Sequence, residues 1–227
     1  MVKRPATIAE RLGLARTLVV RAMLLCGMHA SLLAGIFVGG RSTRMGGRPK
    51  GLLEVTPGVT VVARWRALFE RLEIPAVLVG GHAAYAHLGI PAIADEPHAG
   101  PLGGVLALLA HAGDRMAIAV ACDMPFVSEA LVRRLAFAPR ASAAPAPALA
   151  ARREGRWEPF FARYDSPVVL PIARAEAQAG RFSLKGLLEA AKAAELVLSD
   201  TEAEELDDWD TPEDAASGYP GGGRLLE

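Results

Sequence analysis

Short apolar runs alternate with longer, more amphipathic runs through the middle of this chain. The short runs have the length and composition of buried strands, and they occupy residues 32–38, 75–81 and 116–127. The longer runs read as helices, and they occupy residues 61–72, 101–113 and 128–137. Because strands that alternate with helices pair in parallel through right-handed crossovers, this order predicts an α/β fold built from β-α-β units.

The run at 61–72 shows the helical pattern most clearly. Its apolar residues recur at helical spacing, with arginines on the other side: Val62, Trp65, Leu68, Phe69 and Leu72. The run at 128–137 opens with Ser128, whose hydroxyl can accept a hydrogen bond from the first helical turn. We therefore expect both segments to be helices that pack one face on the sheet.

The composition changes after Pro139. Residues 139–157 are rich in alanine and proline, which is typical either of a linker or of an irregular crossover inside one domain. The apolar "FFARY" that follows favours the crossover. Further on, the spacing predicts a helix over 183–196, and the acidic stretch 200–217 contains a turn and a helix start at Thr211.

Charge and cysteine content exclude several classes of protein. The 227 residues carry 25 basic and 25 acidic side chains, so the formal charge is zero and any anion site must be local. That balance argues against a general nucleic-acid coat. Cys26 and Cys122 provide neither a disulfide framework nor a CxxC metal pair, so a reducing, cytoplasmic compartment fits best.

An uncharged stretch between Arg21 and Arg41 approaches the length of a membrane span, and the basic segment before it also resembles a signal peptide. Against both, the second half of the stretch leads directly into glycines, as a buried parallel strand would. His29 also interrupts it, and no convincing cleavage site precedes the strand. We expect residues 1–27 to be dispensable, with Met28 as a sensible domain start.

A glycine-rich, basic loop follows the first predicted strand. "FVGGRSTRMGGRPKG" (37–51) contains five glycines and four Lys/Arg residues. It fits neither the Walker A pattern nor GxGxxG. Glycines at a strand end let backbone N–H groups approach a ligand, and arginine and lysine bind phosphate oxygens. The loop therefore predicts a phosphate site, with an ordinary turn carrying solvated charges as the alternative.

The segment "GGRSTRMGGRPK" resembles the signature of nucleotidyltransferases, and most closely that of the molybdenum cofactor guanylyltransferases (MobA-type). Val38 departs from the alanine that is usual in this family before the two glycines. Later segments resemble the family's other motifs in the right order, and the matches together run from about residue 32 to 217. These segments are "DEPHAGPLGGV" (95–105), "CDMPFV" (122–127), "EPFFARY" (158–164) and "DWDTPEDAAS" (208–217).

Two of these segments also have simpler interpretations. Pro101 alone would explain a helix start in 95–105. Asp123 could cap the helix that follows it, although Ser128 is better placed for that. A carboxylate at the tip of a buried strand is nevertheless poorly explained as part of a core, because aspartate is almost never fully buried unless it is paired.

The resemblance implies an α/β fold of the nucleotide-diphospho-sugar transferase type, Rossmann-like, with three α/β/α layers and a mostly parallel central sheet. It implies an N-terminal extension over 1–30, a single nucleotidyltransferase domain over 31–217 and a flexible tail over 218–227. The implied reaction is Mg²⁺-dependent transfer of GMP from GTP to Mo-bound molybdopterin. The products would be the guanine dinucleotide cofactor and pyrophosphate.

The resemblance also implies roles for individual residues. Lys50 and Arg44 would hold the triphosphate, and Asp123, with Asp210, would hold Mg²⁺, a hard cation that prefers oxygen ligands. The residues expected around the nucleotide are Val38, Gly39, Gly40, Asp95, Gly100, Pro101 and Leu102. None of the histidines shows the spacing of a metal site.

The last motif departs from the family, because Asp208 and Asp210 stand where asparagines are usual. Asp210 can keep a metal role, since both residue types offer a side-chain oxygen. Asp208 would either contact the second substrate or belong to an acidic loop. Glu158 occupies a position where relatives vary, so the resemblance assigns it no role.

The expected partners are GTP, molybdopterin as acceptor, and transient contacts with other molybdenum-cofactor proteins, without nucleic acid or membrane. Two alternatives stay open. A related nucleotidyltransferase would use CTP or a sugar-phosphate acceptor, and a non-catalytic homologue would bind the nucleotide without turnover. Fold alone does not choose between them, because function resides in the site.

Overall fold

The computed structural model describes residues 32–39, 49–81, 83–96, 99–139 and 146–209. The expected extension at 1–30, the tail at 218–227 and the helix start at Thr211 lie outside these residues. Among the described residues, no helix is long and apolar enough to cross a bilayer.

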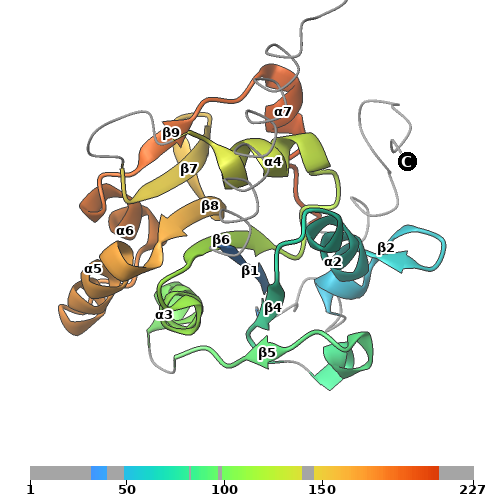
Figure 1. Ribbon diagram of the computed structural model, residues 1–227, viewed down its shortest axis with the longest axis horizontal. Helices are drawn as coiled ribbons and strands as arrows, with labels where there is room; N and C mark the ends of the chain where they lie inside the picture. Colours follow the sequence, from blue (N-terminus) through green and yellow to red (C-terminus); the bar gives the residue numbers. More distant parts are fainter. Residues whose placement is uncertain (1–31, 40–48, 82, 97–98, 140–145, 210–227) are drawn as a thin grey trace, which may run out of the picture.

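A seven-stranded sheet forms the middle layer, in the order β5-β4-β1-β6-β8-β7-β9 (Figure 1). Its strands are β1 (Leu32–Phe37), β4 (Ala76–Val79), β5 (Ala92–Ile93), β6 (Met116–Ala121), β7 (Ala148–Arg153), β8 (Arg156–Asp165) and β9 (Ala194–Leu196). Only β8 runs antiparallel to its neighbours in this sheet; the other pairings are parallel. The predicted mostly parallel sheet is therefore confirmed. A separate hairpin pairs β2 (Glu54–Thr56) with β3 (Val59–Thr60).

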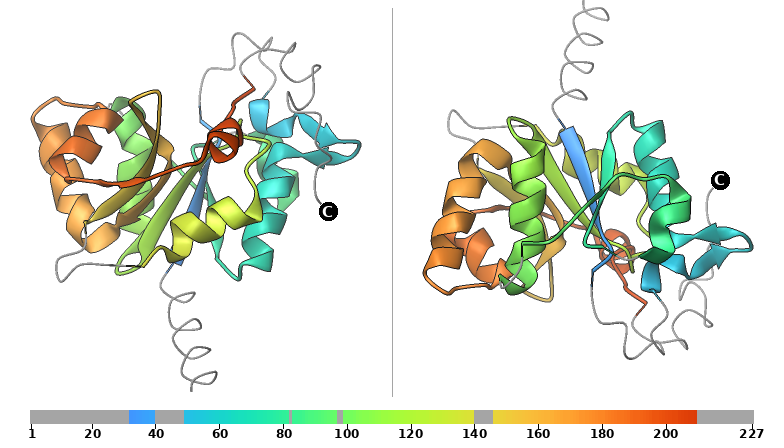
Figure 2. Two further views of the ribbon diagram at one scale, coloured as in Figure 1. Left: turned by 90° about the horizontal axis from the view of Figure 1, so that it is seen from above. Right: turned by 90° about the horizontal axis from the view of Figure 1, so that it is seen from below.

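Helices cover both faces of the sheet, which gives the three layers expected from the sequence (Figure 2). On one side lie α2 (Val61–Arg71), α4 (Glu129–Phe137) and α7 (Asp200–Glu204). On the other side lie α3 (Gly100–Ala112), α5 (Ser166–Gln178) and α6 (Leu184–Ala190). Two short 3-10 helices, η2 (Lys50–Leu52) and η3 (Ala83–Leu88), lie in the connections.

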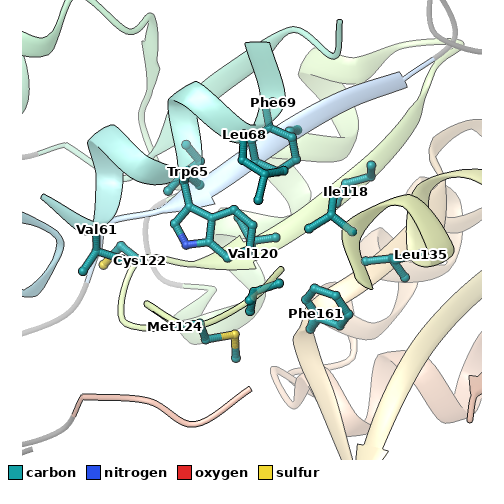
Figure 3. Close-up of a cluster of buried hydrophobic side chains, with 14 of the residues drawn as sticks. Val61, Trp65, Leu68, Phe69, Ile118, Val120, Cys122, Met124, Leu135 and Phe161 are labelled. Carbon is teal, nitrogen blue, oxygen red and sulfur yellow. The ribbon is translucent and has the colours of Figure 1, made fainter. Parts of the chain in front are cut away.

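Each face of the sheet has its own apolar core, because successive side chains of a strand point to opposite faces. In β1, Ile36 belongs to the core under α2, whereas Leu33 and Phe37 belong to the core under α3. The first core is built around Trp65 of α2, which is fully buried and stacks on Phe69 with ring centroids 5.5 Å apart (Figure 3).

The helix cap predicted at Ser128 is present. The Ser128 hydroxyl accepts a hydrogen bond from the Leu131 amide at 3.2 Å, at the start of α4. All five apolar residues of the predicted 61–72 helix are buried.

The strand predicted over 116–127 is shorter than expected. It ends at Ala121, so Asp123 lies in the loop that follows the strand.

The interpretation of 139–157 as an irregular crossover is wrong for its second half, because residues 148–153 form strand β7. This strand pairs with β8 across a two-residue turn, in which Glu154 has φ 49° and Gly155 has φ 76°. A turn with both central residues at positive φ matches the twist of a hairpin. The alanines of β7 are small enough to be buried, which made this strand look like a linker in sequence.

The helix predicted over 183–196 is also wrong at its C-terminal end. It ends at Ala190, and Lys192 then takes a left-handed φ of 51°. The last three residues of the predicted helix form β9, which pairs in parallel with β7. Helices α5 and α7 were not anticipated, and α5 contains an internal proline, Pro171, which weakens a helical pattern in sequence.

We expect Trp65→Ala to lower the free energy of unfolding by about 3–5 kcal/mol, because it empties a fully buried site under α2. Arg66 on the same helix is the matched control. Its side chain is exposed and pairs with Glu70, so Arg66→Ala should cost less than about 1 kcal/mol. Urea unfolding followed by circular dichroism measures both, and equal losses would contradict this account of the core.

Candidate active site

The site lies where the order of the strands reverses. The chain leaves β1 toward β4 and β5 on one side and later returns to β6 on the other. In open α/β sheets, ligands bind beyond the carboxyl ends of the strands at such a point. A cavity of about 560 Å³ opens there. It is lined by residues of several separate segments: Phe37, Val38, Gly39, Lys50, Val79, Asp95, Gly100, Pro101, Gly104, Ala121, Cys122, Asp123, Met124, Glu158, Phe160 and Asp208.

Lys50 and Asp123 meet in the wall of this cavity. The Lys50 Nζ lies 3.1 Å from the Asp123 Oδ2, although the two residues are 73 positions apart in sequence. Their side chains are 20% and 21% exposed, so both charges are partly withdrawn from water and still open to the cavity. The structure thus brings Lys50, from the end of the basic loop, to the aspartate that follows β6.

Asp95 lies against two glycines beside the end of β1. A Cβ on Gly39 would lie 3.4 Å from the Asp95 Oδ2, and a Cβ on Gly80 would lie 3.1 Å from the Gly39 backbone. Gly80 also has φ +90°, a conformation that L side chains rarely adopt. Burial raises the pKa of the Asp95 carboxyl above its ordinary value. The close packing leaves the Gly39 backbone exposed at the cavity.

The first turn of α3 forms the floor next to Asp95. Gly100 and Pro101 line the cavity, as predicted. Gly103 fits closely against the preceding loop, since a Cβ there would lie 2.4 Å from the Glu96 carbonyl oxygen. Leu102 is fully buried in the core between α3 and the sheet and is not among the cavity-lining residues.

The opposite wall comes from β8 and the segment after α7. Glu158 and Phe160 line it from β8, and Asp208 lines it from the later segment. The Trp209 amide donates to the Asp123 carbonyl at 2.9 Å, which ties that segment to the loop after β6. Phe160 also packs against Phe37, with ring centroids 4.7 Å apart.

Arg153 does not line the cavity itself but contacts Glu158, which does, and no motif in the sequence pointed to Arg153. Its Nε donates to the Glu158 Oε1 at 2.9 Å, and its Nη1 donates to the Asp207 Oδ1 at 2.6 Å. The available signal was the Glu154-Gly155 pair, because a two-residue turn there would have predicted a hairpin with Arg153 near its end.

Cys122 also lines the cavity, next to Asp123, but its environment does not suit a nucleophile. Burial raises the pKa of the Cys122 thiol to about 12, so the thiol stays protonated near neutral pH. The predicted residues Gly40, Arg44 and Asp210 lie outside the described residues, so the structure does not place them.

The cavity offers oxygen donors of the kind that Mg²⁺ prefers. Asp123 and Asp208 both line it. Within the part of the chain that the structure describes, no group of three or more His, Cys, Asp or Glu side chains could hold a metal by itself. Mg²⁺ at phosphate-transfer sites is usually held by one or two carboxylates together with substrate phosphates. The residues present therefore fit a magnesium ion that binds together with a nucleotide.

Comparison with known proteins gives a family for most of the chain. The family described as the MobA-like NTP transferase domain matches residues 34–195. The molybdenum cofactor guanylyltransferase of Pseudomonas putida is 34% identical over 185 residues, which is 78% of this chain and 92% of that protein. That of Serratia proteamaculans is 36% identical over 114 residues, which is 48% of this chain and only 56% of that protein.

Solved structures share the fold. The molybdopterin-guanine dinucleotide biosynthesis protein A of Archaeoglobus fulgidus superposes with a TM-score of 0.64 at 21% identity. The superposition covers 82% of this chain and 96% of that one. At this identity, the likeness supports the fold and not the choice of substrate.

We expect Gly103→Ala to destabilise the protein by about 1–3 kcal/mol and to loosen the loop that carries Asp95, because its Cβ would collide with the Glu96 carbonyl. Gly186→Ala in α6 is the matched control. Its Cβ would make only ordinary contacts with Ser183, so replacing a helical glycine should stabilise by up to about 1 kcal/mol. Chemical unfolding, with hydrogen exchange of the peptide containing Asp95, checks both effects. Unchanged exchange in Gly103→Ala would contradict the predicted displacement.

Proposed function

The chain belongs to the MobA-like NTP transferase family, and we propose that it transfers GMP from GTP to molybdopterin that carries molybdenum. The products are the guanine dinucleotide form of the cofactor and pyrophosphate. One observation carries the proposal. Gly39, Lys50, Asp95 and Asp123, which come from four separate segments, line a single cavity at the carboxyl ends of the strands.

In the proposed reaction, an oxygen of the acceptor's phosphate attacks the α-phosphorus of GTP in line. A bond forms between that oxygen and the α-phosphorus, and the bond from the α-phosphorus to the pyrophosphate oxygen breaks. The attacking phosphate is already anionic, so the reaction requires positioning and charge neutralisation more than a strong base. This requirement agrees with the state of Cys122, the cysteine that lines the described part of the site, whose thiol stays protonated.

Lys50 supplies a positive charge at the cavity wall. Its ammonium lies 3.1 Å from a carboxylate oxygen of Asp123. An ammonium that faces the cavity attracts the oxygens of a triphosphate, and the exposed Gly39 backbone allows a nucleotide to approach closely. Arg44, outside the described residues, is proposed to share this role.

Asp123 is the proposed magnesium ligand, with Asp210 as its predicted partner, and Asp208 offers a further oxygen in the same cavity. When bound, Mg²⁺ withdraws charge from the phosphate oxygens during the transfer. The hydrogen bond from Trp209 to the Asp123 carbonyl keeps the segment containing Asp208 next to Asp123. We further propose that the protein works in the cytoplasm, with transient contacts to other molybdenum-cofactor proteins.

A nucleotide panel tests the proposal. Purified protein with Mg²⁺ is given each NTP in turn, with and without molybdopterin, and pyrophosphate release is followed. We expect release only with GTP and only when the acceptor is present. Preference for CTP would replace the proposal with the related cytidylyl transfer, and release that ignores molybdopterin would reject the acceptor.

Asp123→Ala should reduce guanylyl transfer at least about 100-fold, because it removes a charged group at the reacting phosphates. The fold should persist, since the Asp123 side chain is partly exposed and only its backbone carbonyl holds Trp209. Asp114→Ala, in an exposed turn after α3, is the control and should keep normal turnover. The thermal midpoint of each variant is measured together with the rate. Near-normal turnover of Asp123→Ala would remove Asp123 from the mechanism.

A further inference from the structure

The cavity has a second half that the nucleotide motifs do not account for. Gly39, Asp95 and the start of α3 line the half next to β1. Glu158 and Phe160 line the other half from β8, which lies two strands away from β1 in the sheet. With neighbouring strands just under 5 Å apart, the backbones of β1 and β8 are separated by roughly 10 Å. The two halves meet where the Phe160 ring packs on Phe37 of β1. Asp123 lies in the loop after β6, the strand between β1 and β8.

An irregularity in the sheet forms this second half. Ala150 of β7 pairs with Ala162, whereas the next residue, Ala151, pairs with Glu158. The segment between these partners on β8, Pro159–Phe161, therefore has no opposite residue on β7. Bulges re-aim side chains and are frequent beside active sites. Here the bulge places both Glu158 and Phe160 at the cavity.

Glu158 is fixed in place by the arginine behind it. Arg153 donates to one oxygen of Glu158 and, through a second nitrogen, to Asp207, the neighbour of the cavity residue Asp208. The side chains of Arg153 and Glu158 are 26% and 20% exposed. The other carboxylate oxygen of Glu158, Oε2, accepts no hydrogen bond from any described residue. A guanidinium fork holds a carboxylate in one orientation better than a lysine would.

We propose that Glu158 selects the acceptor by receiving N–H donors from its heterocycle, and that Arg153 is the positioning residue that orients Glu158. This inference rests on the proposed guanylyl transfer. The acceptor's phosphate has to reach Lys50 and Asp123, so the rest of the acceptor extends into the half that the nucleotide leaves open.

The chemistry of this half matches a pterin. A pterin ring carries a ring N–H and an exocyclic amino group side by side, and an ionised carboxylate is an acceptor only, able to take both. Phe160 beside Glu158 offers an aromatic surface to a flat ring. If a heterocycle carries a carbonyl in place of the amino group, the carbonyl oxygen would face a carboxylate oxygen of Glu158. Both atoms are hydrogen-bond acceptors, so no hydrogen bond would form between them.

Two fragments that differ only at this edge provide a direct binding test. Pterin (2-amino-4-oxopteridine) carries the amino group, and lumazine (2,4-dioxopteridine) has a carbonyl in its place. Fluorescence titration of the full chain should show tighter binding of pterin, and Glu158→Gln should remove that preference. Equal binding of both fragments by the unaltered chain would overturn the proposal without any measurement of turnover.

Kinetics with GTP and molybdopterin provide the second test. Glu158→Gln should raise KM for molybdopterin roughly 10- to 100-fold, as expected when a hydrogen bond to a charged group is lost. KM for GTP should change less than about 2-fold. Arg153→Met should also raise KM for molybdopterin selectively, and Arg153→Lys should raise it less. The double variant Glu158→Gln/Arg153→Met should have the same KM for molybdopterin as Glu158→Gln alone, because Arg153 acts through Glu158.

The chain contains a matched control pair between β7, which carries Arg153, and its neighbour β9. Arg152 neighbours Arg153 and pairs with Glu195 at 3.7 Å, and neither residue lines the cavity. Arg152→Met and Glu195→Gln should leave both KM values unchanged. An effect of these controls equal to that of Arg153→Met would reduce Arg153 to a structural role.

The remaining outcomes are also distinct. A rise in KM for GTP instead of molybdopterin would assign Glu158 to the guanine base, which presents a similar pair of donors, and would overturn the acceptor assignment. Absence of guanylyl transfer by the unaltered chain would reject the proposed function. In that case the titration with pterin and lumazine still shows whether Glu158 recognises the edge of the heterocycle that carries the amino group.

Discussion

The parallel pairing of β1 with β6 is the interaction on which the rest of this structure depends. These two strands match residue for residue from Leu32–Met116 to Phe37–Ala121, and the Cys122 amide extends the ladder by donating to the Phe37 carbonyl. Parallel pairing brings the carboxyl ends of both strands to one edge of the sheet. The end of β1 and the loop that carries Asp123 consequently lie side by side.

A chain with no net charge can therefore still concentrate charge in one place. Lys50, at the start of η2, lies beside Asp123 in the loop after β6, and the resulting pair stays partly buried. Carboxylates also line the opposite wall, at Glu158 and Asp208. Such a local arrangement suits the proposed function, in which one side binds a triphosphate and the other presents hydrogen-bond acceptors.

The two halves of the site are built from different parts of the fold, because the antiparallel strand β8 forms the second half. The parallel strands deliver loops at their carboxyl ends, whereas β8 contributes Glu158 and Phe160 from within its own length, where the bulge interrupts pairing with β7. A side chain on a strand is held more rigidly than one on a loop, and Arg153 restrains Glu158 further. The site thus combines loops around the nucleotide with a fixed wall on the other side.

Local patterns in the sequence predicted the elements of the β-α-β units and singled out the residues proposed to bind the nucleotide. Hydrophobic periodicity identified α2 with Trp65, Ser128 marked the start of α4, and the glycines and charges around Lys50 pointed to phosphate chemistry. These features are encoded within a few neighbouring residues. Only the tertiary structure decided the strand order, the strand β7 in an alanine-rich segment, the early end of α6 and the clamp of Arg153 on Glu158. Each of these depends on which distant segment a residue pairs with, and contacts between distant segments leave no periodic trace in the chain.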